Sequence, residues 1–108
     1  MTTEIIRYQI DEGNVQAFEK AYQKAESILQ ASKHCLGYRL LRGHEEPQNW
    51  ILMIEWDSVE GHEQGFRKEP AFREFFALVK PFFNSIQEMK HYESRPMNWN
   101  RTSMERHT

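Results

Sequence analysis

The sequence predicts one α+β domain that pairs with a second copy of itself through a β-sheet, and three observations support this prediction. The chain has 108 residues, enough for one hydrophobic core but not for two. Hydrophobic residues make up 39% of it and charged residues 28%, a balance typical of a folded domain. Its apolar positions change period along the chain, from the alternation of strands to the three-and-four spacing of helices.

Charge and cysteine content narrow the classes of function. The net charge is -2 and the basic residues are scattered, so no basic stripe is available for nucleic acid or anionic lipid. Cys35 is the only cysteine, and residues 1–4 lack the features of a secretory signal. The apolar run at residues 50–54 is far shorter than the ~20 residues of a membrane-spanning helix. We therefore expect a cytoplasmic protein without nucleic-acid or membrane partners.

The first half of the chain predicts a strand, a long helix and a hairpin. Residues 4–10 form the strand and end at a dense turn signal. The helix runs from Asn14, its expected cap, to Ser32, because apolar residues recur there at spacings of three and four. Residues 38–44 and 48–57 are extended runs on either side of Pro47, which cannot donate to a sheet ladder, so we expect them to form the hairpin.

The second half predicts an interrupted helix and a last strand. Asp57 or Ser58 is the expected helix cap, with Glu60 as the capping-box partner of Asp57, and Glu69-Pro70 interrupts the helix. Beyond the interruption, four aromatic rings share one helical face: Phe72, Phe75, Phe76 and Phe83. Pro81 bends or ends that helix. Residues 85–93 form the final strand, so the domain spans residues 1–93 and residues 94–108 form a polar tail that we expect to be flexible.

The order of these elements is β-α-β-β-α-β, which right-handed crossovers fold into a ferredoxin-like split βαβ sandwich. In the third strand, alternate residues from Trp50 to Trp56 share one face, whereas Ile51 and Met53 share the other. Two helices cover only one face of a four-stranded sheet, so the opposite face would expose an apolar patch in a monomer. We therefore expect a homodimer through the sheet face.

One set of residues carries a family resemblance. It consists of Glu55-Trp56-Asp57-Ser58, His62, Gly65-Phe66-Arg67, Phe72, Phe75 and Pro81-Phe82, after the strand, helix and hairpin. This pattern resembles the antibiotic biosynthesis monooxygenase family, whose members are dimeric α+β barrels. The resemblance covers residues 4–93. It specifies the fold better than the chemistry, because the family includes quinone-forming monooxygenases, haem-degrading enzymes and many members without known activity.

The haem-degrading members carry three pocket residues that this chain lacks. They have an Asn on the first strand, a Trp in the second helical segment and a His on the last helix. Here the corresponding stretches are Ile5-Ile6-Arg7-Tyr8, Gly65-Phe66 and Phe75-Phe76. Haem degradation is therefore disfavoured.

His62 is the candidate catalytic residue. It lies about one turn into the predicted second helix, where the partial positive charge of the helix start lowers an imidazole pKa and keeps a general base neutral near pH 7. A structural or solvent-facing histidine is the alternative. Aromatic side chains either fill the core or line a pocket for a flat, ring-bearing ligand. The candidates for substrate binding are Tyr8, Tyr22, Trp50, Trp56, Phe66, Phe72 and Phe76.

Other polar residues give weaker signals. Four of them lie on predicted strands, where an inward-facing donor would stabilise an oxyanion. The sequence does not decide which face of the sheet each one takes: Arg7, Tyr38, Arg39 and His91. The five histidines lack the spacing and the cysteine pairs that zinc sites favour, so we expect no metal. No glycine-rich phosphate loop or nucleophile elbow is present in the sequence, and we expect no cofactor.

The resemblance implies a cofactor-independent monooxygenase that acts on a small phenolic or anthrone-like compound and forms a quinone. His62 would then be the base and the aromatic residues would hold the rings. Two alternatives stay open. One is a non-catalytic module that binds a small apolar ligand or haem, and the other is a lactone isomerase on the same fold.

Overall fold

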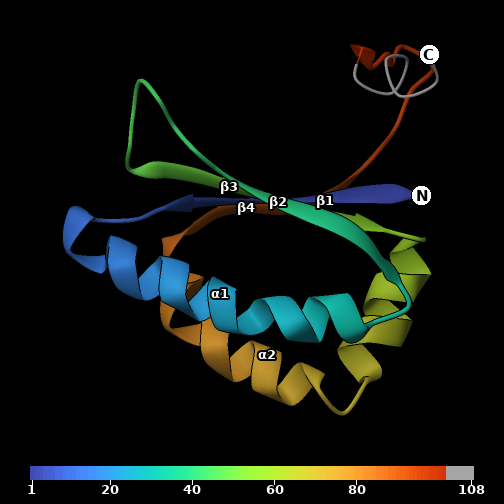
Figure 1. The fold of residues 1–108 in the computed structure, drawn as a ribbon, viewed down its shortest axis with the longest axis horizontal. Helices are drawn as coiled ribbons and strands as arrows, with labels where there is room; N and C mark the ends of the chain where they lie inside the picture. The colour runs from blue at the N-terminus through green and yellow to red at the C-terminus, as the bar shows by residue number, and fades with distance from the viewer. Residues whose placement is uncertain (102–108) are drawn as a thin grey trace.

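The chain folds as a four-stranded sheet with its helices on one face (Figure 1). The computed structural model describes residues 1–101. The strands and main helices follow the order β1 (Thr2–Gln9), α1 (Val15–Ala31), β2 (Cys35–Arg42), β3 (Asn49–Trp56), α2 (Phe72–Val79) and β4 (Ile86–Glu93). This is the ferredoxin-like α+β fold that the sequence predicts.

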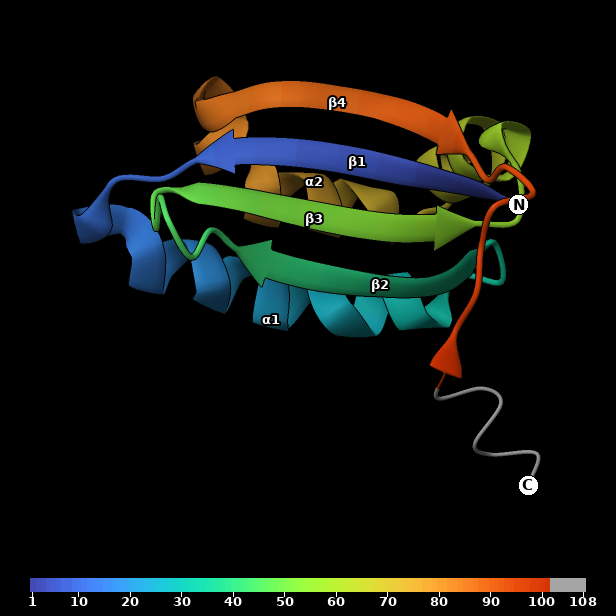
Figure 2. The same cartoon turned by 90° about the horizontal axis from the view of Figure 1, so that it is seen from above.

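The sheet is antiparallel throughout, with the strand order β2-β3-β1-β4 (Figure 2). β1 pairs with both β3 and β4, so Ile6 lies opposite Leu52 on one side and Met89 on the other. Residues opposite one another in a sheet project to the same face. The register therefore brings side chains from three strands together beneath the helices.

Phe18 of α1 is the centre of the core. Its side chain is fully buried and meets the rings of Tyr8, Trp50 and Phe82 edge-on, at centroid distances of 4.9, 5.4 and 5.3 Å. Edge-on contact aligns the positive rim of one ring with the negative face of the next, and burial of one such side chain stabilises the fold by about 1.5–3 kcal/mol. This cluster fixes α1 against β1 and β3.

The predicted first helix is confirmed to within one residue at each end, and Asn14 occupies its N-cap position as predicted, but without a side-chain capping bond. A 3-10 turn, η1 (Glu12–Asn14), leads directly into α1. Asn14 already has helical backbone angles, with φ -105 and ψ -1, and its side chain makes no capping bond. Its backbone N–H donates instead to the Asp11 carbonyl at 2.8 Å, so the turn starts the helix without a side-chain cap.

The predicted strands are confirmed with shifted ends. The first strand begins two residues earlier than expected and the last begins one residue later. β2 starts at Cys35 rather than at Tyr38, because an irregularity between Cys35 and Gly37 lets the strand continue its pairing with β3. The hairpin between β2 and β3 is confirmed.

The second helical region, residues 58–85, is broken more often than the sequence predicts. The break at Glu69-Pro70 is confirmed, since α2 begins just after it. Before the break the chain forms a π-helical turn and a short 3-10 turn, and after α2 it forms another 3-10 turn that contains Pro81. These turns are η2 (Gly61–Gly65), η3 (Phe66–Lys68) and η4 (Lys80–Ser85).

Ser58, one of the two predicted caps of this region, is confirmed as the cap, whereas the predicted capping box of Asp57 and Glu60 does not form. Ser58 Oγ accepts a hydrogen bond from the Gly61 backbone N–H at 2.8 Å, which makes Ser58 the cap. The Asp57 carboxylate contacts the imidazole of His34 at 2.8 Å instead. Glu60 makes no capping bond.

The face of the sheet opposite the helices carries an apolar patch. Ile5 lies opposite Met53 and Leu41 lies opposite Ile51, and these four residues form what we call the outer patch. Leu41 is 38% exposed and the other three are half-buried. This result confirms the alternation predicted for the third strand.

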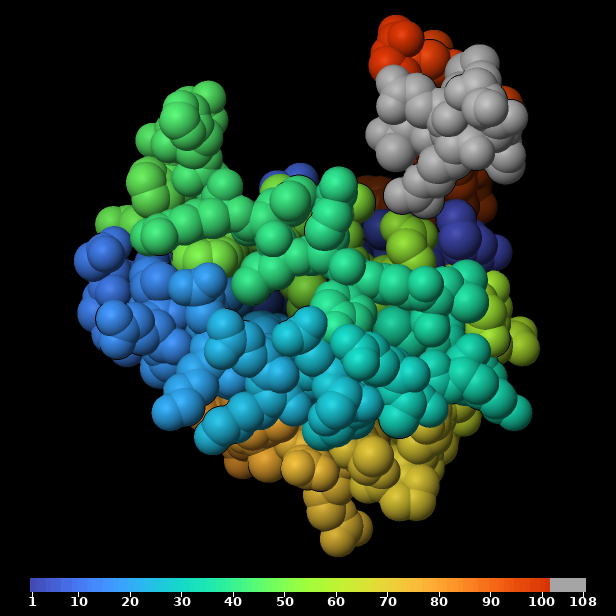
Figure 3. Space-filling view, viewed as in Figure 1, coloured from blue at the N-terminus to red at the C-terminus, as the bar shows by residue number. Residues whose placement is uncertain are grey.

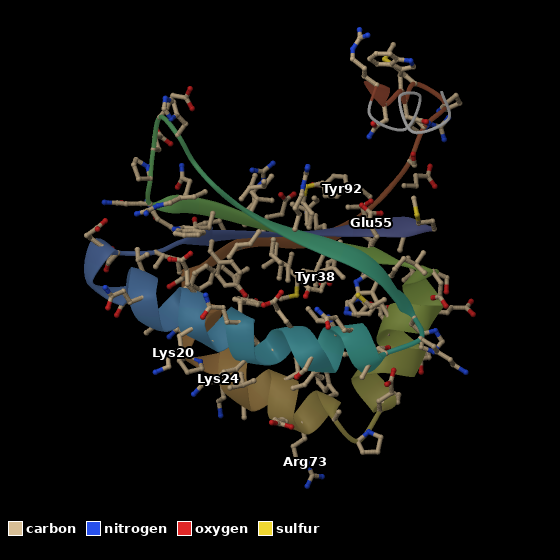
Figure 4. The ribbon with its side chains drawn as sticks, in the orientation of Figure 1. Lys20, Lys24, Tyr38, Glu55, Arg73 and Tyr92 are labelled. Atoms are coloured by element: carbon tan, nitrogen blue, oxygen red, sulfur yellow. The ribbon has the colours of Figure 1, made fainter. Side chains whose placement is uncertain are left out.

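Some of the polar residues beside the outer patch pair within the chain. Arg7 Nε donates to Glu88 at 2.8 Å, and the Thr3 hydroxyl donates to Glu55 at 2.7 Å. Glu55 lies with Tyr92 on the outer face, the side of the sheet away from the helices (Figure 4). Arg39, opposite Met53, and Lys90, opposite Ile5, lie on the same face and take part in no ion pair within residues 1–101. The outer patch is therefore apolar, with basic residues at its border.

Two segments rise above the outer face, the loop between β2 and β3 and the chain after β4 (Figures 1 and 3). Residues 94–100 contain no helix or strand. The flexibility expected of residues 94–108 stays a prediction, and residues 102–108 lie outside the described part of the chain. Within residues 1–101, no helix combines the length and apolar character needed to cross a membrane.

Candidate functional site

A cavity of about 350 Å³ lies between the sheet and the second helical region. Its walls are mostly aromatic and aliphatic, which suits a small ring-bearing ligand. The lining residues come from the sheet and from the helical layer: Glu4, Ile6, Tyr8, Tyr22, Ile54, Trp56, His62, Phe66, Arg67, Phe72, Phe75, Phe76, Val79, Phe83 and Met89.

The structure brings most of the predicted site residues to this cavity. His62 lines it together with Tyr8, Tyr22, Trp56, Phe66, Phe72 and Phe76. Trp50 corrects the prediction, because it does not line the cavity. It shares a sheet face with Trp56 but lies at the other end of β3, where Phe18 covers its ring and the Arg42 guanidinium lies 4.9 Å from it.

Of the four polar residues on the predicted strands, one lies at the site and three lie away from it. The first is His91, which contacts His62 as described below. The Tyr38 hydroxyl donates to Glu26 of α1 at 2.7 Å and lies outside the cavity. Arg7 is paired with Glu88, and Arg39 is exposed on the outer face.

Sequence reasoning missed three polar or polarisable residues of the cavity, Glu4, Arg67 and Met89. Glu4 could have been predicted, because every second residue of a strand projects to the same face and Glu4 therefore shares the face of Ile6 and Tyr8. Arg67 stands next to the predicted pocket residue Phe66 but on an irregular turn, so helical periodicity does not give its direction. Met89 depends on the register between β1 and β4.

Tyr8 and Tyr22 join their hydroxyl groups by a hydrogen bond inside the protein. Burial raises the pKa of Tyr8 to about 12 and raises the pKa of Tyr22 further, so both phenols stay protonated. Two hydroxyl groups carry two hydrogens, and the bond between them uses one. The second hydrogen is available to an oxygen atom of a ligand in the cavity.

His62 lies on η2 with its ring stacked on Trp56, at a centroid distance of 4.4 Å and an angle of 10°. His62 as a whole is 3% exposed. Nδ1 lies 2.7 Å from His91 Nε2, and Nε2 accepts a hydrogen bond from Arg67 Nε at 3.3 Å. Since Arg67 only donates, Nε2 carries the lone pair, and the neutral tautomer has its proton on Nδ1, donated to His91.

The pKa of His62 is lowered to about 3, so the ring is neutral near pH 7 as the sequence predicts. The main cause is burial, followed by the positive charges of Arg67 and His91. The expected cause was the helix start. The structure adds burial and these two neighbours as causes, and the effect of the helix start stays a prediction.

Glu4 places a buried carboxyl group beside His62. One of its oxygens accepts a hydrogen bond from Trp56 Nε1 at 3.1 Å and lies 3.6 Å from His62 Nε2. Burial raises the pKa of Glu4, while the bond from Trp56 and the positive charges of His91 and Arg67 oppose that rise. The Trp56 indole therefore holds both groups in place, one by hydrogen bonding and the other by stacking.

Glu4, His62 and His91 could together hold a metal ion. They offer one ligand atom each within 4.8 Å of one another, from three elements that are far apart in the sequence. Two imidazoles and a carboxylate suit divalent transition metals. A cation would have to open the bond between His62 and His91, and it would stand beside the Arg67 guanidinium.

Two glycines bring η2 close to the sheet and so position His62. A methyl group at Gly65 would lie 2.4 Å from the His34 ring, and one at Gly61 would lie 1.8 Å from an Asp57 oxygen. The His34–Asp57 pair therefore occupies the space that side chains at these positions would need. His62 directly follows the first glycine and enters the cavity.

Comparison with known proteins identifies relatives of this chain. Residues 1–78 match the family described as antibiotic biosynthesis monooxygenase. The uncharacterized protein YczJ of Bacillus subtilis (strain 168) is 30% identical over 93 residues, which cover 86% of this chain and 98% of that protein.

Solved structures show the same fold. A putative antibiotic biosynthesis monooxygenase from Bordetella bronchiseptica has a TM-score of 0.76 at 26% identity, covering 87% of this chain and 96% of that one. SnoaB, a cofactor-independent oxygenase from Streptomyces nogalater, has a TM-score of 0.70 at 13% identity, covering 89% and 94%. At that identity SnoaB supports the fold alone. By the family match, the chain belongs to the antibiotic biosynthesis monooxygenase family.

Proposed function

We propose that the protein is a cofactor-independent monooxygenase that converts a small phenolic or anthrone-like compound into a quinone. The observation that carries this proposal is an aromatic cavity with a neutral imidazole in its wall. The rings of Trp56, Phe66 and Phe72 would hold a flat substrate, and His62 would take its proton. Family membership and the fold shared with SnoaB are consistent with this chemistry.

The substrate itself would supply the electrons. Loss of an acidic proton gives an electron-rich anion, which passes one electron to O₂. The resulting radical and superoxide combine into a peroxide at the ring carbon, which takes up a proton and loses water to leave a carbonyl. In total, a CH₂ group and O₂ become a C=O group and H₂O, so no external reductant is needed.

His62 and His91 would move the proton as a pair. The substrate's acidic group replaces Arg67 as the partner of His62 Nε2 and gives its proton there. The proton on Nδ1 then passes to His91 Nε2, 2.7 Å away. His91 is half-buried, so the charge leaves the buried ring for a position nearer to water. The free hydrogen of the Tyr8–Tyr22 pair would stabilise the substrate oxyanion.

We also infer that a second copy of the chain covers the outer patch to form a homodimer. The patch of Ile5, Leu41, Ile51 and Met53 is apolar and lies on the face of the sheet that no helix of the described chain covers (Figure 1). A sheet-on-sheet contact of about 1,600 Å² is the usual size of a stable interface. Such a contact would leave the cavity free, since the cavity lies on the other face of the sheet.

The test is oxygen uptake by the purified, chelator-treated protein with a panel of hydroquinones and dihydroxyanthracenes. We expect protein-dependent uptake and quinone formation, with a loss of at least about a hundredfold in His62→Gln, the range of general base catalysis. His44→Gln, in the exposed loop between β2 and β3, is the matched control and should keep full activity.

Four other outcomes would redirect the proposal. No uptake by the wild type would reject oxygenation, and unchanged uptake in His62→Gln would reject the base. Uptake that disappears with chelator and returns with a divalent metal would assign the chemistry to an ion held by Glu4, His62 and His91. Anaerobic conversion of a lactone would favour an isomerase.

A further inference from the structure

The Arg67 side chain has a positive charge without a direct ion pair to another described residue, although its charge acts on the Glu4 carboxyl group beyond His62. Within residues 1–101 it takes part in no ion pair. Its Nε donates to His62 Nε2 at 3.3 Å, and one terminal nitrogen lies 3.9 Å from the Met89 sulfur. Both are neutral acceptors, and the second is a weak one. A guanidinium normally gains most from a carboxylate or phosphate, which it binds through two parallel hydrogen bonds.

Arg67 stands where two hollows meet. It lines the aromatic cavity, and together with Phe72 and Phe76 it also lines an adjoining surface hollow. Arg67 itself is exposed, so the guanidinium reaches the cavity from its open side. It joins η3 to β4 through its contact with Met89, across the opening. A ligand that enters the cavity from this hollow must pass it.

The adjoining hollow is basic. Besides Arg67 it is lined by Lys68 and Arg73, and its only acidic residue among those described is Glu69. Glu69 already accepts a hydrogen bond from the Ser32 hydroxyl at 2.7 Å. Arg73 extends from α2 away from the sheet (Figure 4), so Arg67 is the cation of this group that reaches the cavity. The opening therefore presents positive charge beside aromatic walls.

We propose that Arg67 recognises an anionic oxygen group on the ligand, so that the natural ligand is an aromatic acid with its rings in the cavity and its carboxylate or phosphate at the opening. This inference rests on the proposed function only in taking the cavity to bind rings. The acid group would give the guanidinium a direct ionic partner. When the guanidinium turns to this partner and leaves His62 Nε2, the lone pair of that nitrogen becomes free for the ligand's hydroxyl group.

The test compares ligands that share one ring system and differ in charge. Isothermal titration of the chelator-treated protein would use 2-naphthol, 3-hydroxy-2-naphthoate and 2-naphthyl phosphate. We expect an acid to bind at least about tenfold more tightly than 2-naphthol, because a hydrogen bond to a charged group contributes roughly 1.5–3 kcal/mol. The better of the two acids identifies the anion, and added salt should reduce its advantage.

Two variants assign the effect to Arg67. Arg67→Gln should abolish the advantage of the acid, so that the ratio of the affinities for the acid and for 2-naphthol falls to about 1 within this variant. Lys24→Gln removes the same charge from the solvent side of α1 (Figure 4) and should change neither affinity. A general effect of net charge would appear in both variants, whereas recognition by Arg67 appears in one.

The outcomes that would overturn the inference are distinct from those that would overturn the proposed function. Equal affinity of all three compounds for the wild type would refute anion recognition and leave ring binding intact. An equal loss for all three in Arg67→Gln would show that Arg67 shapes the cavity instead of binding an anion. If no compound bound, ring binding itself would fail, and both proposals with it.

Discussion

The neutral state of His62 follows from where its ring lies. Stacking on Trp56 replaces water on one face of the imidazole, and Arg67 adds positive charge near one of its nitrogens. An imidazolium in this position is desolvated and repelled, so the proton is lost. The same surroundings leave a lone pair at Nε2, which a base needs.

This environment predicts a stability loss in acid. His62 has a pKa of about 3 in the folded chain against a usual 6.5, so between these values the unfolded chain binds the extra proton. Unfolding is therefore favoured progressively as pH falls below 6.5, by about 2 kcal/mol at pH 5. Between pH 7 and pH 5, the free energy of unfolding of His62→Gln should therefore fall by about 2 kcal/mol less than that of the wild type.

Urea unfolding at a fixed protomer concentration measures this effect, since association would otherwise shift the midpoint. His44→Gln is the control, because His44 is exposed in the β2–β3 loop and should leave the pH dependence as in the wild type. Parallel curves for the wild type and His62→Gln would contradict the burial argument.

The site was only partly open to prediction from the sequence. His62 and most of the aromatic walls follow from the order of elements. The partners of His62 do not, because His91 lies 29 positions away on β4 and its face depends on the register with β1. The error for Trp50 has the same origin, since alternation gives a face of the sheet but not the end of the strand that a helix covers.

At the scale of elements, the turn η2 determines where His62 and Phe66 point. A π-helical turn widens the backbone by one residue per turn and so changes the direction of the side chains that follow. Here it packs its two glycines against the His34–Asp57 pair. Sequence periodicity predicts an ordinary helix at this point, because the widening depends on contacts with His34, which is distant in the chain.

We therefore expect Gly65→Ala to be destabilising. The added methyl group would lie 2.4 Å from the His34 ring, which must move and give up its contact with Asp57. Overpacking of this kind costs typically about 1–3 kcal/mol. The free energy of unfolding, measured in urea, should fall by that amount.

A double-mutant cycle tests the cause. In a His34→Ala background the ring is absent, so Gly65→Ala should cost much less than in the wild type. Gly13→Ala is the matched control, because a methyl group there has no atom within 4 Å. If the cost of Gly65→Ala is the same in both backgrounds, the contact with His34 is not its source.

At the scale of the whole molecule, the sheet separates two functions. Residues of alternate parity on β1 and β3 line the cavity on one face and the outer patch on the other. The sequence predicted this division, because period-two alternation is a local property of a strand. It also predicted the fold, since the order of elements and right-handed crossovers leave few topologies.

The proposed homodimer leads to a prediction about Met53, which lies at the middle of the outer patch. A carboxylate at this position would lie opposite Arg39 of β2, and a sheet-on-sheet contact would remove both charges from water, which costs several kcal/mol per ion. Met53→Glu should therefore be monomeric at micromolar concentration by size exclusion with light scattering, whereas we expect the wild type to be a dimer. Circular dichroism should show the same secondary structure for both.

Val59→Glu serves as the control for this substitution. Val59 is 40% exposed and lies in the second helical region, away from the outer face, so the variant should remain a dimer. A wild type that runs as a monomer at micromolar concentration would reject the homodimer, as would a Met53→Glu variant that still associates.

The opposite placement of the outer patch and the cavity has a consequence for ligand titration. Two chains joined back to back would hold their cavities on the far sides of a double-layered sheet, and neither opening would border the other chain. Each binding event would then leave the neighbour's opening untouched. Titration should give two equivalent ligands per pair and a hyperbolic curve with a Hill coefficient of about 1, in contrast to sites that share an interface.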